Sequence, residues 1–131
     1  MLQEKNAPTR TDQFERVHQI FDFFEKLIVQ YQIDCVSMEQ LFFTKFNQSN
    51  AEFVYAIRGA LMVLFLRHHI PVQEYTPIEL KKYLTGNGKA DKMLVQKMVM
   101  RCFNLSDLPQ FNDAADALGL AYLAKRNYQA Y

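Results

Sequence analysis

The first quarter of the chain carries apolar residues at steps of three and four, separated by polar and charged positions. They are Phe14, Val17, Ile20, Phe21, Phe24, Leu27, Ile28 and Tyr31. This spacing places them on one side of an α-helix, so it predicts an amphipathic helix. Thr11 is the expected N-cap, because its hydroxyl can accept a hydrogen bond from a free backbone N–H of the first turn. Residues 1–10 are mostly polar and are expected to be irregular.

Two short apolar segments flank a second helical stretch. Ile33–Met38 and Pro71–Tyr75 are predicted to be strands, and the residues from Ser49 to about His69 are predicted to form a helix. Ser49 and Glu52 have the spacing of a capping box at the start of that helix. A long helix between two strands forms a βαβ unit, so the strands should run parallel.

The last part of the chain predicts three shorter helices. The first covers Ile78–Leu84, with Pro77 in its first turn, where the missing N–H of proline leaves no hydrogen bond unmade. A second helix follows a turn at Gly86–Gly88, since Gly and Asn adopt positive φ at little cost. The last helix covers Asp113–Lys125 and is expected to be capped by Asn112. The pattern predicts a single α/β domain over residues 1–131.

Composition supports a folded domain and narrows its partners. Half of the 131 residues are hydrophobic and 22% are charged, which is typical of a globular protein rather than a disordered one. The net charge of +1 means that any nucleic-acid surface must come from local clustering of basic residues. Cys35 and Cys102 form neither a zinc pattern nor a disulfide framework, which favours a cytoplasmic protein. The most apolar stretch, Ala60–Leu66, is too short to span a membrane, so no membrane contact is expected.

Three carboxylates are candidates for chemistry. Glu39 follows a predicted parallel strand, at the end where open α/β sheets bind ligands, and Asp113 and Asp116 lie three apart on one helix. An Asp in a first helical turn is often explained by the helix dipole alone, and a Glu at a strand end is often only solvated. However, apolar residues follow Asp116, so this helix should be largely buried. Two acids there would repel each other unless a cation neutralised them, and oxygen ligands favour Mg²⁺ or Mn²⁺ over zinc.

Basic residues gather around the glycine turn. They are Lys81, Lys82, Lys89, Lys92, Lys97 and Arg101, with Asp91 as the only acid among them. An isolated run of this kind is usually a solvated helix face. Here it flanks Gly86 and Gly88, whose small size would let a phosphate backbone approach closely. Such a surface would bind DNA or RNA through phosphates, without sequence preference and with strong salt dependence.

These segments together resemble a known family. YTPIELKKYLTGNGKADKMLVQKMV followed by NDAADALGLAYLA, with IDCVSMEQLFF and AIRGA upstream, resembles the RuvC family of crossover-junction endodeoxyribonucleases, the Holliday-junction resolvases. The resemblance extends from about Arg10 to Ala124 in family order. The combination of DAADAL with TGNG-x-ADK is specific, whereas either motif alone would be a moderate signal.

The resemblance implies a ribonuclease-H-like fold, a homodimer and four-way junction DNA as substrate. It implies that the helix beginning at Ser49 forms much of the dimer interface, and that each active site binds two Mg²⁺ ions, with Mn²⁺ as an alternative. A branch-migration complex of the same pathway is a candidate partner. The implied catalytic residues and metal ligands are Glu39, Asp113 and Asp116. The implied DNA-binding residues are Phe42, which would stack on unpaired bases, together with Lys81, Gly86, Gly88, Lys89 and Lys92.

One family feature has no counterpart in the sequence. The first ligand of the family is an Asp in a GxDPG-like turn on the first strand, and neither Asp12 nor Asp34 has that context. We therefore expect a ribonuclease-H-like fold that lacks its first strands, with two parallel strands and four to five helices. We expect little or no cleavage by this chain, although the full-length protein would nick junctions. The alternatives are a non-catalytic remnant that binds four-way junctions and an unrelated interaction module.

Overall fold

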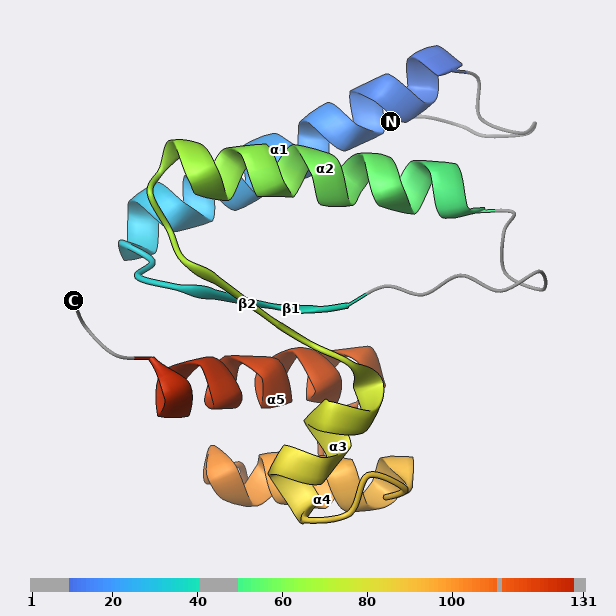
Figure 1. The fold of residues 1–131 in the computed structure, drawn as a ribbon, viewed down its shortest axis with the longest axis vertical. Helices are drawn as coiled ribbons and strands as arrows, with labels where there is room; N and C mark the ends of the chain where they lie inside the picture. The colour runs from blue at the N-terminus through green and yellow to red at the C-terminus, as the bar shows by residue number, and fades with distance from the viewer. Residues whose placement is uncertain (1–9, 41–49, 111, 129–131) are drawn as a thin grey trace. The chain divides into compact units, whose positions relative to one another are not determined.

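The computed structural model describes residues 10–40, 50–110 and 112–128. Its elements, drawn in Figure 1, are α1 (Arg10–Tyr31), β1 (Val36–Glu39), α2 (Ala51–Arg67), β2 (Val72–Tyr75), α3 (Pro77–Thr85), α4 (Lys92–Cys102) and α5 (Asn112–Asn127). They form two compact units, one containing α1 and α2 and the other containing both strands and α3, α4 and α5. The mixed α/β composition, with two strands and five helices in the described residues, agrees with the prediction.

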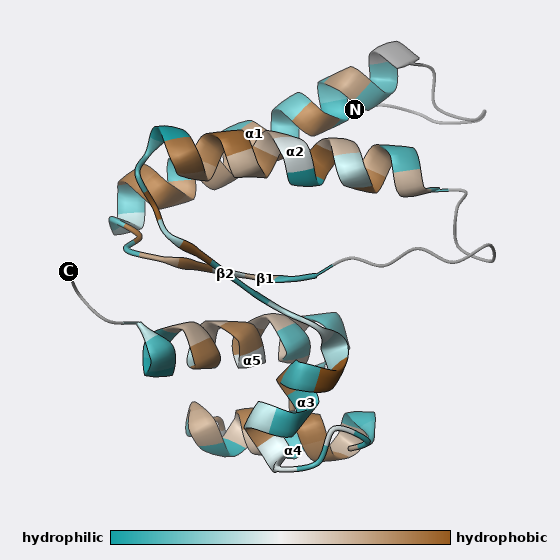
Figure 2. Cartoon of the chain, in the orientation of Figure 1, coloured by the Kyte–Doolittle hydropathy of each residue, from teal (hydrophilic) through white to brown (hydrophobic). Residues whose placement is uncertain are grey.

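The first unit is a pair of packed helices. Figure 2 shows that hydrophobic residues dominate the C-terminal half of α2, where Leu64 and Phe65 are buried. At the end of the pair, the ring Nε2 of His68 lies 3.0 Å from Oε2 of Glu25, which joins α2 to α1. Among the described residues, no helix combines the length and the apolar character that crossing a membrane requires.

Three helix starts differ from the prediction. α1 begins at Arg10, so Thr11, its expected N-cap, lies inside the helix. Two further helices differ by one residue. The N-cap of α2 is Asn50, whose side chain makes no capping hydrogen bond, and the predicted cap Ser49 lies outside the described residues. Asn112 was expected to precede α5 but is its first residue. Both differences shift a boundary by one residue, because a residue with a short polar side chain is compatible with the cap and with the first helical position.

The second unit is built on a two-stranded parallel sheet, as the βαβ pattern predicted. Val36 pairs with Val72, and the register continues to Glu39, which pairs with Tyr75. The backbone N–H of Gln40 donates to the carbonyl oxygen of Tyr75 at 2.8 Å, so the pairing extends to the end of β1. The strands are shorter than predicted, and each contributes four residues to the sheet.

The core of the second unit lies between the sheet and its helices. Its buried residues are Tyr75, Leu80, Leu84, Ala90, Val95, Val99, Leu120 and Leu123. Figure 1 shows α5 lying across the strands, with α3 and α4 beyond it. Gly119 makes this packing possible, because a Cβ there would lie 2.6 Å from Cδ1 of Leu84. The absence of a side chain at Gly119 therefore brings α5 close to α3.

Two side-chain caps and one glycine fix the ends of α3 and α4. The Thr76 hydroxyl caps α3 by accepting from the backbone N–H of Glu79 and also donates to the Glu79 carboxylate, each at 3.1 Å. Gly86 ends α3 in the left-handed conformation, with φ of 83°. Asp91 then caps α4 by accepting from the N–H of Leu94 at 2.8 Å. The predicted Gly86–Gly88 turn is confirmed between these two helices.

Candidate functional site

Three carboxylates come together where β1 meets α5. Glu39 is the last residue of β1, and Asp113 and Asp116 lie in the first turns of α5, which packs against β1. We call these three residues the acidic edge. Asp116 is half-buried and adjoins buried Ala115, whereas Asp113 is exposed. The structure thus brings together the three acids that the sequence singled out.

The acids of this edge repel one another. Burial raises the pKa of Glu39, and the negative charges of Asp116 and Asp113 raise it further. Burial also raises the pKa of Asp116, and Asp113 adds to the increase. Glu39 and Asp116 are therefore held in a field that disfavours their charge, and a cation bound beside them would relieve that field.

Two lysines face the acidic edge from neighbouring helices. Lys81 of α3 and Lys92 of α4 each lower the pKa of Asp116, although burial and Asp113 have the larger combined effect. Lys81 is half-buried and Lys92 is exposed. Positive charge is therefore already present beside Asp116, in a position to meet a phosphate that approached the carboxylates.

The donor set of the edge suits a hard divalent cation. Carboxylate oxygens are the ligands of Mg²⁺ and Mn²⁺, and no sulfur or imidazole belongs to the edge. Within the described part of the chain, no three His, Cys, Asp or Glu side chains are already placed to hold one metal ion. The acidic edge therefore offers the carboxylate oxygens that a hard divalent cation prefers as ligands.

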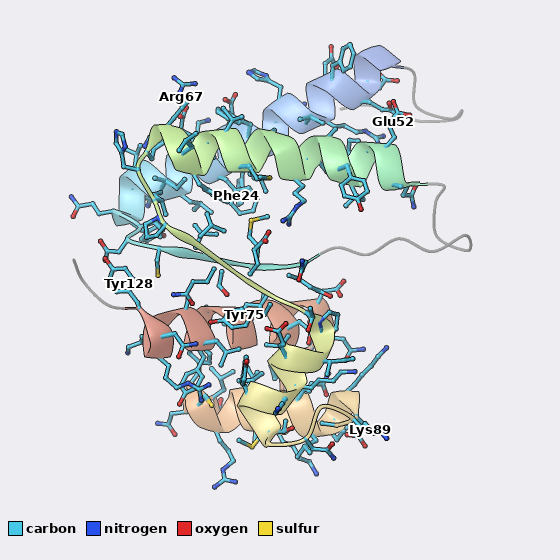
Figure 3. The ribbon with its side chains drawn as sticks, in the orientation of Figure 1. Phe24, Glu52, Arg67, Tyr75, Lys89 and Tyr128 are labelled. Atoms are coloured by element: carbon cyan, nitrogen blue, oxygen red, sulfur yellow. The ribbon has the colours of Figure 1, made fainter. Side chains whose placement is uncertain are left out.

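The glycine turn has structural reasons for its composition. A Cβ on Gly86 would meet nothing within 4 Å, but the positive φ favours glycine there. At Gly88, a Cβ would lie 3.0 Å from Cγ2 of Ile78, so a larger residue would crowd α3. The Asn87 side chain accepts from the N–H of Lys89 at 2.9 Å, and Figure 3 shows Lys89 projecting from this turn. The turn exposes a lysine beside small residues, which is the arrangement the sequence predicted.

Two site residues need separate comment. Phe42, the predicted base-stacking aromatic, lies outside the described residues. Gln96 of α4, which sequence analysis did not select, donates through Nε2 to Oδ1 of Asn112 at 2.7 Å, next to Asp113. No motif or charge pattern in the sequence marks Gln96, because its importance depends on which helix α4 packs against.

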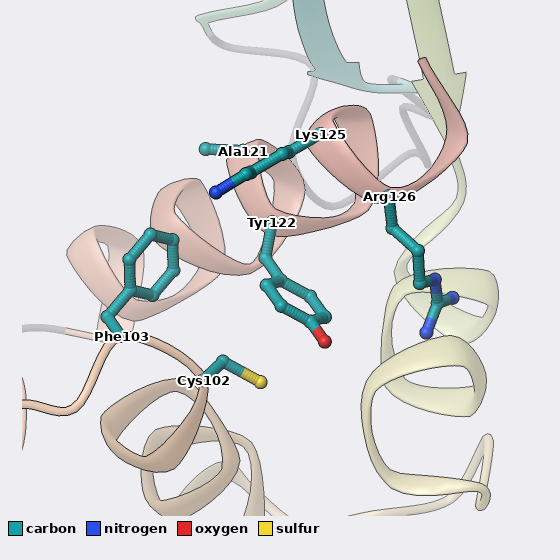
Figure 4. A pocket seen from close by; sticks show the side chains of 6 residues that line it. All are labelled: Cys102, Phe103, Ala121, Tyr122, Lys125 and Arg126. Atoms are coloured by element: carbon teal, nitrogen blue, oxygen red, sulfur yellow. The ribbon is translucent and has the colours of Figure 1, made fainter. Parts of the chain in front are cut away.

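Each of the two units contains a cavity with its own lining residues. In the second unit, Figure 4 shows a hollow of about 330 Å³ at the C-terminal ends of α4 and α5. Its lining residues are Cys102, Phe103, Ala121, Tyr122, Lys125 and Arg126. The Arg126 guanidinium lies 5.9 Å from the Tyr122 ring centre. In the first unit, α1 and α2 leave an apolar groove of about 410 Å³. Neither lining includes a residue of the acidic edge.

Solved structures define the class of fold. Thermus thermophilus RuvC superposes with a TM-score of 0.77 and 26% identity, over 96% of this chain and 86% of that one. A second structure, described as T. thermophilus RuvC in complex with Holliday junction substrate, has a TM-score of 0.79 and 28% identity. That match covers 94% of this chain and 72% of the other. The chain therefore has the ribonuclease-H-like α/β fold of a junction-resolving nuclease.

The sequence assigns the family within that class. The family model described as crossover junction endodeoxyribonuclease RuvC matches residues 5–123. The RuvC of Thermotoga maritima is 40% identical over 118 residues, and that of Syntrophomonas wolfei is 34% identical over 123 residues. The chain belongs to the RuvC family of crossover junction endodeoxyribonucleases, which are metal-dependent endonucleases.

The matches cover most of this chain but a smaller share of its relatives. They include 90% of this chain and 67% of the Thermotoga maritima protein, and 94% and 71% for Syntrophomonas wolfei. For the RuvC of Caldicellulosiruptor saccharolyticus, the match includes 72% of this chain and 57% of the relative. The chain thus spans about two thirds of the length of the curated relatives that it matches.

Proposed function

We propose that this chain belongs to a structure-specific endonuclease that resolves Holliday junctions by symmetric, Mg²⁺-dependent nicking in recombination and repair. Little or no cleavage is expected of this chain itself, because the family's first Asp ligand has no counterpart in it. One observation carries the proposal: Glu39, Asp113 and Asp116 share a repulsive field where β1 meets α5, with Lys81 and Lys92 beside them. A cluster of carboxylates that repel one another lowers the stability of the folded state, so it is unfavourable in a purely structural role. Its presence favours a cation-binding function.

We propose the three carboxylates as ligands of two Mg²⁺ ions, with Mn²⁺ as an alternative. Bound divalent cations would supply Lewis-acid polarisation of the phosphate and activation of a water. The protein's part is to hold the carboxylates together on β1 and α5 and to limit their contact with water. The half-buried position of Asp116 serves the second task, since lower solvation strengthens electrostatic interactions.

DNA would approach from the side of α3 and α4. Lys81 and Lys92 are proposed to hold phosphates next to the acidic edge, and Lys89 with Gly86 and Gly88 would contact the backbone beyond it. These contacts carry no sequence information, so they suit a substrate recognised by its shape. Phe42 is proposed to stack on bases unpaired at the crossover.

A symmetric junction suits a symmetric protein. We propose a homodimer, because a two-fold assembly presents two equivalent sites to two matching strands. In α2, which the resemblance assigns to the interface, Met62, Val63 and Leu66 are exposed by 52%, 55% and 76%. Cys35 and Cys102 are not joined in a disulfide, which favours the reducing cytoplasm as the compartment. A branch-migration complex of the same pathway is the proposed protein partner.

An alternative function is junction binding without cleavage. It is favoured by the absence, within the described residues, of three acidic or imidazole side chains already placed around one metal position. The three carboxylates of the edge are also one fewer than the four ligands that the resemblance implies. In this alternative, the lysines and α2 would retain binding and dimerisation while the acids make no productive metal site.

Gel shifts and cleavage assays on the same DNA separate these functions. We expect this chain to bind a four-way junction more tightly than linear duplex of equal length, and equal affinity would contradict both functions. Symmetric nicks that require Mg²⁺ and disappear in Asp116→Asn would establish the nuclease. Selective binding with no nicking at any Mg²⁺ concentration would establish the non-catalytic alternative. Asp107→Asn, which changes an exposed loop acid, is the matched control for both measurements.

A further inference from the structure

A hydrogen bond between side chains connects α4 to the start of α5. Gln96 Nε2 donates to Asn112 Oδ1 at 2.7 Å, across sixteen positions of sequence. Asn112 is the first residue of α5, so the bond reaches the helix immediately before Asp113. Gln96 is half-buried on α4, whereas Asn112 is exposed. The contact is therefore made at the point where α5 begins and the acidic edge is positioned.

The first turn of α5 is the part of that helix that most needs such a contact. The first four N–H groups of a helix have no partner within the helix, and helix ends open more readily than helix centres. The buried residues of α5 begin at Ala115 and include Gly119, Leu120, Leu123 and Ala124. Core packing thus holds the later turns, while exposed Asp113 lies ahead of them.

The donor of the bond is on a firmly held helix. Val95 and Val99, on either side of Gln96 in α4, are 3% and 0% exposed, and the Asp91 side chain caps the start of α4. Lys92 lies four residues before Gln96 and so shares its side of the helix. The same side of α4 therefore acts on α5 twice, through the charge of Lys92 on Asp116 and through the bond to Asn112.

We propose that Gln96 is a positioning residue for the acidic edge. By holding Asn112, it keeps the first turn of α5 closed, and this fixes Asp113 and Asp116 relative to Glu39. Gln96 itself touches neither the carboxylates nor, in this proposal, the DNA. The consequence for metal binding rests on the proposed function, whereas the tether itself can be tested in the metal-free protein.

Amide hydrogen exchange of the metal-free protein tests the tether. The amides of Asp116 and Ala117 donate to carbonyls in the first turn, so their exchange reports opening of that turn. Gln96→Ala should accelerate both about fivefold, the change expected from losing one hydrogen bond of about 1 kcal/mol. Asn112→Ala should do the same, with no further effect in the double variant. Asn112→Asp keeps the acceptor and should remain near the original rate.

The far end of α5 offers a matched control. Asn127 Nδ2 donates to the Tyr75 hydroxyl at 2.8 Å, so Asn127→Ala also removes an asparagine bond between α5 and a neighbouring element. It should leave the exchange of Asp116 and Ala117 unchanged. Equal acceleration by Asn127→Ala, or no acceleration by Gln96→Ala, would overturn the tether.

Mn²⁺ titration followed by electron paramagnetic resonance tests the consequence. Gln96→Ala should weaken Mn²⁺ binding by up to about fivefold, the factor that corresponds to the lost hydrogen bond of about 1 kcal/mol, while Asn127→Ala should not. Unchanged Mn²⁺ affinity together with faster exchange would remove Gln96 from any positioning role in metal binding. Absence of Mn²⁺ binding in the unsubstituted protein would instead contradict the proposed ligand set, while the exchange rates would still decide the tether.

Discussion

At the scale of single residues, the repulsion within the acidic edge lowers the stability of the folded protein. The pKa values of Glu39 and Asp116 are raised by burial and by neighbouring carboxylates. A group with a higher pKa in the folded state than in the unfolded state binds more protons when folded. The free energy of unfolding therefore falls as the pH rises through this range, and the full loss is present at neutral pH.

Asp116→Asn should stabilise the metal-free protein at pH 7. Removing the charge relieves its desolvation and the repulsion with Asp113, and we expect a gain of about 0.5–1 kcal/mol, since Asp116 is only half-buried. The gain should vanish near pH 3, where the carboxyl is protonated in both states. Urea denaturation between pH 3 and pH 8 measures the effect.

The control is the same chemical change in the loop after α4. Asp107→Asn should give no comparable gain at pH 7, because Asp107 is exposed and does not belong to the acidic edge. A destabilised Asp116→Asn variant at pH 7 would show that this carboxylate makes a net favourable interaction in the fold. That result would remove the main support for a cation site.

At the scale of elements, one sequence pattern had different outcomes at two positions. Ser49 and Glu52 were predicted to form a capping box, but Ser49 lies outside the described residues, and the N-cap of α2 is Asn50, whose side chain makes no capping bond. Thr76 and Glu79 have the same spacing, and the Thr76 hydroxyl caps α3 by accepting from the Glu79 N–H, with a proline between the two residues that favours the first helical turn. The periodicity of apolar residues thus located both helices, but spacing alone could not decide which polar residue would cap them.

Gly119→Ala should destabilise the protein by about 1–3 kcal/mol, because the new methyl group would overpack the contact between α5 and α3. Its Cβ would lie 2.6 Å from Leu84 Cδ1 and 3.3 Å from Leu80 Cδ1, and both leucines are buried. Thermal denaturation followed by circular dichroism measures the loss. The same variant should weaken Mn²⁺ binding if α5 shifts away from β1.

Gly59→Ala provides the opposite outcome with the same substitution. Gly59 lies inside α2, and a Cβ there would meet nothing within 4 Å. Alanine is the better helix former by about 0.5–1 kcal/mol, so this variant should be more stable. Equal effects of the two substitutions would contradict the close approach at Gly119.

At the scale of the whole molecule, basic and acidic residues are clustered in separate places, although the net charge is small. The net charge is only +1, yet six basic residues and one acid lie between Lys81 and Arg101, while three of the acids form the acidic edge. Both groups can be predicted from the sequence, because the DAADAL and TGNG motifs mark them. The Gln96 contact and the action of Lys81 and Lys92 on the same carboxylate cannot be predicted, because they depend on how the helices pack.

Lys81→Ala should weaken binding to a four-way junction and to linear duplex by similar factors. If Lys81 neutralises one phosphate, the slope of log affinity against log salt concentration should become shallower by about 0.9. Fluorescence anisotropy at several salt concentrations measures both quantities. Lys26→Ala, at an exposed position in α1, should leave the slope unchanged, and an equal change there would show that binding reads only total charge.

The register of the sheet also fixes an order of events during synthesis on the ribosome. Val36 pairs with Val72, so β1 is translated 36 residues before its partner strand. At elongation rates of about 5–20 residues per second, β2 follows β1 by several seconds. The α1–α2 pair can form during that interval, whereas the acidic edge must wait longer, for Asp113 and Asp116. The nascent chain therefore acquires its candidate site last.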